Sequence, residues 1–152
     1  MQGESELDYA KLKDFLSFYI ERYMPAVEDL PLDKRPMAVC EALEKKSMKL
    51  AFTGLRQAIN DCVEMSLHFA PAEVEKFDLE LRSRDIVTLS ELRRRYSKSY
   101  AKIMKRGRIK SETEYYLARN VLDDPTEKTP EERELLGRLI SDYEEGAQQG
   151  SA

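Results

Sequence analysis

The residues best suited to chemistry in this sequence are the bases that gather between Arg82 and Lys110. This segment holds eleven Lys or Arg residues and only two acids, Asp85 and Glu91, although the chain as a whole carries a formal net charge of −4. Such a local excess of one sign of charge indicates a binding surface, because it attracts partners of opposite charge over a distance. The segment is therefore a candidate binding surface for an anionic partner.

A helical projection of residues 89–106 separates these bases from an apolar face. The apolar face consists of Leu89, Leu92, Tyr96, Tyr100 and Ile103. We therefore expect Tyr96 and Tyr100 to pack in the core rather than to stack on a ligand. The candidate binding residues form a basic stripe on the other side, and they are Arg94, Arg95, Lys98, Lys102, Lys105 and Arg106.

Three interpretations of the basic stripe are open. It can be a solvated face that is partly neutralised by the acidic C-terminal helix, since residues 121–145 carry nine acids against three bases. It can dock on an acidic surface of a protein partner, where complementary charge speeds encounter and gives specificity. It can also contact the phosphates of a nucleic acid, with residues 93–110 supplying the charge.

The stretch Thr88-Leu89-Ser90-Glu91-Leu92, followed by a basic segment, resembles the helix-turn-helix of bacterial DNA-binding proteins. The resemblance covers about twenty residues and implies a second, recognition helix that reads DNA. Tyr96-Ser97 stands where such motifs usually have Gly, and the apolar face continues without a break from Leu89 to Ile103. This continuity predicts a single helix over 89–106.

Signatures of catalysis are absent from the sequence. His68 is the only histidine, and Cys40 and Cys62 are the only cysteines, which is too few for the usual zinc site. No Gly-rich phosphate loop is present. We therefore expect no catalytic residues, no metal and no cofactor, and a protein that is not an enzyme. A helical enzyme with an unrecognised site is a distant alternative.

The periodicity is helical nearly throughout and predicts an all-α, single-domain bundle of five to six helices. The expected helices cover about 5–24, 36–67, 71–82, 89–106, 112–122 and 130–145. Capping boxes predict the starts of the last three, because Thr88, Ser111 and Thr129 each precede a glutamate by three residues. Gly107 and Gly146 are the expected ends of the fourth and sixth helices.

The chain of 152 residues is expected to form one domain over 1–146, followed by a disordered tail over 147–152. Cys40 and Cys62 would lie roughly 33 Å apart on one helix, so we expect buried free thiols. No apolar run is long enough to span a membrane, and the N-terminus lacks the pattern of a secretory signal. These features predict a cytoplasmic protein.

Together, these observations predict a non-enzymatic interaction or regulatory module that binds an acidic protein surface through a basic helix. A small inhibitor or an immunity-type protein would fit this description. The alternative is a nucleic-acid-associated protein.

Overall fold

The computed structural model describes residues 2–150, and the side chains of residues 8–147. This part of the chain contains eight α-helices and no strand, which confirms the all-α prediction. In chain order the helices are α1 (Gln2–Tyr23), α2 (Pro36–Lys46), α3 (Met48–Met65), α4 (Pro71–Ser83), α5 (Leu89–Tyr96), α6 (Lys98–Arg106), α7 (Glu112–Asp123) and α8 (Pro130–Gly150). Short 3-10 turns occupy Pro25–Asp29, Leu32–Lys34 and Ser66–His68, the last of which is named η3.

The expected number of five to six helices is too low, because two of the expected helices are each broken at a serine. The helix expected over 36–67 is interrupted at Ser47, and the one expected over 89–106 is interrupted at Ser97. Each serine has an extended backbone, and its Oγ accepts a hydrogen bond from the N–H three residues later, Leu50 N at 3.3 Å and Tyr100 N at 3.1 Å. A serine hydroxyl therefore ends one helix and begins the next.

The predicted caps are present. Thr88, Ser111 and Thr129 each accept a hydrogen bond from the N–H of the glutamate three residues later, at 3.1 to 3.2 Å. Gly107 ends α6 in the left-handed conformation, with φ of 73°. The end expected at Gly146 is wrong, because α8 continues to Gly150. Residues 147–150 of the expected tail are therefore helical, and residues 151–152 lie outside the described residues.

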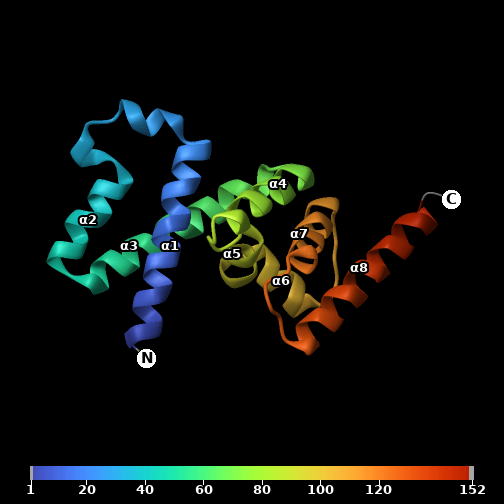
Figure 1. The fold of residues 1–152 in the computed structure, drawn as a ribbon. Coiled ribbons are helices and arrows are strands. Elements are labelled where there is room, and N and C mark those ends of the chain that lie inside the picture. Colours follow the sequence, from blue (N-terminus) through green and yellow to red (C-terminus); the bar gives the residue numbers. More distant parts are fainter. Residues whose placement is uncertain (1, 151–152) are drawn as a thin grey trace.

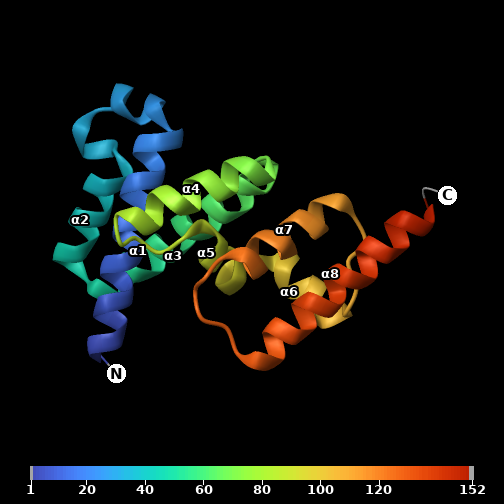
Figure 2. The same cartoon turned by 45° about the vertical axis from the view of Figure 1, so that its right-hand side comes forward.

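The apolar side chains form two clusters, and the helices that build them, α1 to α4 for one and α6 to α8 for the other, lie on either side of α5 (Figures 1 and 2). The first cluster is built by α1 to α5 and contains Phe15, Phe77 and Leu92. The second is built by α6, α7, α8 and the segment before α7, and it contains Ile103 and Leu136. Helix α5 contacts α3, α4, α6 and α7, and α4 also contacts α7, so α5 and α4 both join the helices of the first cluster to those of the second.

The break at Ser97 has a packing reason. Leu89 and Leu92 of α5 belong to the first cluster, whereas Tyr100 and Ile103 of α6 belong to the second. The apolar face that runs without a break in the sequence therefore serves two different cores. Tyr100 is buried, as expected, and Tyr96 is half-buried against the first cluster.

Helices α2 and α3 pack on each other, so the two cysteines lie on different helices and not on one as expected. Both are buried free thiols, which confirms that part of the prediction. Helices α2 and α3 approach closely at Gly54, where an added Cβ would lie 3.4 Å from Leu43 Cδ1.

The cap at Ser97 is open to a direct test. Ser97→Ala removes the only side-chain acceptor seen for Tyr100 N–H, and we expect the free energy of unfolding to fall by about 1 kcal/mol. Urea denaturation of the purified variant measures this loss. Ser99→Ala, two residues further on and without a capping bond among the described residues, is the matched control and should leave stability within about 0.5 kcal/mol. Equal losses in both variants would show that Ser97 is not a cap.

Candidate interaction surface on helices α5 and α6

Helix α5 is fixed at its first turn by hydroxyl and carboxylate groups. Thr88 caps the helix, and the buried carboxylate of Asp78 on α4 accepts hydrogen bonds from both the N–H and the Oγ–H of Ser90. Burial raises the pKa of Asp78 to about 6, against the hydrogen bonds from Ser90. These contacts set the direction in which the arginines of α5 point.

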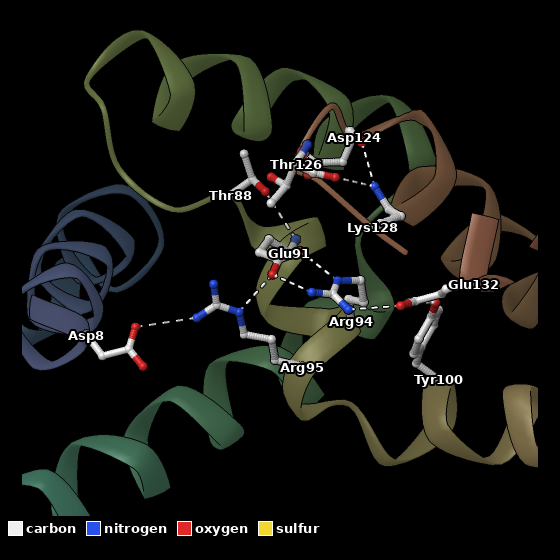
Figure 3. Close-up of polar contacts among 10 residues, drawn as sticks. All are labelled: Asp8, Thr88, Glu91, Arg94, Arg95, Tyr100, Asp124, Thr126, Lys128 and Glu132. Carbon is white, nitrogen blue, oxygen red and sulfur yellow. Dashed lines mark hydrogen bonds and ion pairs between the residues drawn. The ribbon is translucent and has the colours of Figure 1, made fainter. Parts of the chain in front are cut away.

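Glu91 is the centre of the polar network in Figure 3. Its side chain is 1% exposed, and it accepts two hydrogen bonds from Arg94, at 2.9 and 3.0 Å, and one from Arg95 Nε at 2.7 Å. A buried carboxylate needs such partners, because desolvation of an unpaired charge is costly. Two of the six candidate binding residues are therefore engaged by one internal acid.

The same arginines connect α5 to both ends of the chain. Arg94 Nη1 donates to Glu132 Oε1 of α8 at 3.0 Å, and the Tyr100 hydroxyl donates to Glu132 Oε2 at 2.6 Å. Burial, and then the bond to Glu132, raise the pKa of Tyr100. On the other side, Arg95 Nη1 lies 3.7 Å from Asp8 of α1. Arg94 and Arg95 thus act as internal links between helices (Figure 3).

Arg106, the last residue of the basic stripe, is also paired. Its Nη1 and Nη2 atoms lie 2.8 and 3.1 Å from the carboxylate of Glu114 on α7. This bidentate pair fastens the end of α6 to the start of α7.

Three members of the basic stripe remain without such partners. Lys98, Lys102 and Lys105 are exposed, and they project from α6 on the side opposite Tyr100 and Ile103. No hydrogen bond or ion pair joins their ammonium groups to any residue that the structure describes. We call these three residues the lysine face.

The acidic helix α8 covers the basic stripe only in part. Of its acids, Glu132 reaches Arg94, while Glu144 pairs with Arg119 and accepts a hydrogen bond from Tyr115 of α7. Within the described side chains, none of the acids of α8 pairs with the lysine face. The neutralisation expected from the C-terminal helix is therefore present at Arg94 and absent at the lysines.

A further set of buried polar groups closes the loop before α8. Lys128 is 8% exposed, and its ammonium group donates to the carbonyls of Asp124 and Thr126 at 2.7 and 2.8 Å (Figure 3). Burial lowers the pKa of Lys128. The Asp124 carboxylate accepts from Thr126 N and from Arg82 Nη2. Backbone carbonyls thus satisfy Lys128, which leaves it a structural role.

Family models, curated proteins and solved structures yield no match to this chain, so its function has to be argued from its own residues. In the described part of the chain, no three His, Cys, Asp or Glu side chains are grouped so as to hold a metal ion. No helix there has the length and apolarity needed to cross a membrane.

The Glu91 network predicts a large stability effect. Glu91→Gln removes the charge that faces both Arg94 and Arg95, and we expect it to lower the free energy of unfolding by about 1.5 to 3 kcal/mol. Urea denaturation monitored by circular dichroism measures the change. Glu131→Gln, at an exposed position of α8, is the control and should cost less than about 0.5 kcal/mol. A comparable loss in the control would mean that the buried pairs are not the cause.

Asp78 predicts a pH effect. Its pKa is raised from 3.8 to about 6 in the folded protein, so between these pH values the folded state keeps a proton that the unfolded chain has released. Rising pH across this window therefore destabilises the wild type. Asp78→Asn should remove this term, and its stability relative to wild type should increase by roughly 2 to 3 kcal/mol from about pH 4 to about pH 7. Parallel pH–stability curves for the two proteins would contradict the assignment.

Proposed function

We propose that this protein is a non-enzymatic interaction module that binds an acidic surface of a protein partner through the lysine face. The observation that carries the proposal is the presence of Lys98, Lys102 and Lys105, exposed and without acidic partners among the described residues, on an otherwise acidic chain. Their charge is free to steer a partner and to fix its orientation. The buried free cysteines support a reducing, cytosolic location as part of this proposal.

A shallow groove beside α6 supports a protein as the ligand. The groove has a volume of about 440 Å³ and lies between α6 and α8, with Ala101, Met104 and Leu135 among its lining residues. Protein interfaces commonly combine an apolar centre with a charged, solvated rim. The lysine face would form the rim, and an apolar side chain of the partner would enter the groove.

The acids near the groove argue against a long nucleic acid. Glu131 and Glu132 line its far side, and Glu134 is exposed one turn further along α8. A duplex carries one phosphate charge for about every 1.7 Å of its axis, so a duplex lying across α6 would meet these carboxylates as well. A short acidic segment of a protein can cover the lysines without reaching them.

Nucleic-acid binding is the second candidate, and the break at Ser97 favours it. Residues 88–106 form two helices joined by a single residue, and the second helix presents the lysines outward. Such an arrangement is closer to a helix-turn-helix than one continuous helix would be. The exposed bases Arg108 and Lys110 extend the charge beyond α6.

Charge reversal of the lysine face separates the two candidates. In Lys98→Glu/Lys102→Glu/Lys105→Glu, an acidic protein partner should be lost from affinity capture in nuclease-treated lysate, by tenfold or more in quantitative mass spectrometry. A captured partner supports the proposal only if, once purified, it binds the wild-type protein directly. The affinity of this binding must also fall as salt rises and in the charge-reversal variant.

The control variant reverses an equal number of lysines elsewhere, in Lys45→Glu/Lys46→Glu/Lys49→Glu at the exposed junction of α2 and α3. It should retain the partner. Fluorescence anisotropy with duplex DNA and with structured RNA, at two salt concentrations, provides the other half of the test. Salt-dependent binding of either probe that only the lysine-face variant loses would favour the second candidate. Equal behaviour of both variants in all assays would contradict both.

A further inference from the structure

A pocket that includes no residue of the lysine face is lined by a buried cation, Arg93 of α5. The pocket has a volume of about 370 Å³ and lies between η3, the start of α4 and the first turns of α7. Arg93, which is 3% exposed, is one of its lining residues. A volume of this size is within the range of sites for small molecules.

The guanidinium of Arg93 is only partly satisfied by the protein. Nε donates to Ser66 Oγ at 3.1 Å, and Nη2 donates to the backbone carbonyl of Ser66. Among the described residues, every enclosed side-chain nitrogen or oxygen has a hydrogen-bond partner. Nη1 has no such partner among these residues, so it is not enclosed. Nη1 is therefore accessible, and Arg93 is among the residues that line the pocket.

The positive charge of Arg93 also lacks an ion pair. Arg94 and Arg95 each have carboxylate partners, but no carboxylate of the described residues pairs with Arg93. Asp78 is near enough to favour the charged form, although its carboxylate is engaged by Ser90. Burial is the larger effect and lowers the pKa of Arg93 to about 10, so the group stays charged at neutral pH. A buried charge in this state gains from an anion.

The rest of the lining indicates what kind of anion would fit. Leu67, Phe69 and Leu117 offer apolar surface, and Asn120 offers an amide. Glu112 is also in the lining, and its interaction with the Tyr116 hydroxyl raises the pKa of Tyr116. The negative charge of Glu112 disfavours a phosphate dianion, whereas a single carboxylate on an apolar body matches one arginine and an apolar wall.

We propose that this pocket binds a small organic carboxylate with an apolar body, and that Arg93 is the residue that holds the carboxylate. The carboxylate would accept from Nη1, and the apolar body would lie against Phe69 and Leu117. This site is separate from the lysine face, so the two proposals stand or fall independently.

A matched pair of probes tests the proposal. We expect 3-phenylpropanoate to bind, and the neutral 3-phenylpropanamide to bind at least about tenfold more weakly, because it lacks the charge that Arg93 would meet. Titrations followed by ¹H–¹⁵N NMR should shift the backbone signals of Tyr116 and Asn120. Equal affinity for acid and amide, or no shift at millimolar 3-phenylpropanoate, would overturn the proposal.

Two variants place the binding in this pocket. Arg93→Lys should weaken 3-phenylpropanoate at least about tenfold, since an ammonium lacks the planar fork of a guanidinium. Arg93 also holds Ser66, so folding is checked by circular dichroism, and a second variant leaves this contact intact. Thr113→Trp fills the pocket from the exposed first turn of α7 and should abolish binding, whereas Ser141→Trp on the exposed side of α8 should not. Undiminished binding by Thr113→Trp would overturn the proposal.

A peptide pair identifies the source of the carboxylate. The dipeptide Ala-Phe with a free carboxylate is compared with its C-terminal amide. Tighter binding of the free dipeptide than of 3-phenylpropanoate would assign the pocket to the C-terminus of a protein chain. Tighter binding of 3-phenylpropanoate would assign it to a small molecule. Both results depend on the same contact with Arg93.

Discussion

The buried carboxylate of Glu91 is the interaction on which the arrangement of this protein depends. It lies on α5, a helix of the first apolar cluster that also contacts α6 and α7 of the second, and it holds Arg94 and Arg95 in opposite directions. Arg94 then reaches α8 through Glu132, and Arg95 reaches α1 through Asp8. Apolar contacts are not directional, and they would tolerate several relative orientations of the two clusters. The pair between Arg94 and Glu132 spans the two clusters and favours one orientation, a contribution to conformational specificity that buried polar networks make in some proteins.

Local structure was predictable to the extent that one residue determines it. Three helices begin where the sequence predicts, at the caps Thr88, Ser111 and Thr129, and α6 ends where predicted, at Gly107. Each of these signals acts within one helical turn, so the local sequence is enough to predict it. The helix break at Ser97 was not predicted, because a helical projection shows which residues share a face and not which apolar cluster each of them packs into. Leu92 and Ile103 share a phase, yet they pack into different clusters.

The sequence identified the bases of the candidate site but not which of them are free of internal partners. The six bases of the stripe were identifiable from their spacing alone. The partners of its three arginines are of two kinds. Glu91 precedes Arg94 and Arg95 by three and four positions, a spacing at which helical pairs form, so this part was readable from the sequence. Glu132 and Glu114 come from other helices, and no local pattern connects them to Arg94 or Arg106.

The arginines of α5 and α6 and the lysine face are used differently, and the chemistry of the groups explains why. Arg93, Arg94 and Arg106 are held by two or more hydrogen bonds each, to which a planar, weakly hydrated guanidinium is well suited. The residues of the lysine face are strongly hydrated ammonium groups on flexible stems, and they remain in water. Hydrated point charges favour fast, salt-sensitive encounters, whereas a buried guanidinium favours a ligand of defined shape. The two proposed sites therefore differ in the kind of partner they would recognise for the same reason that they differ in residue type.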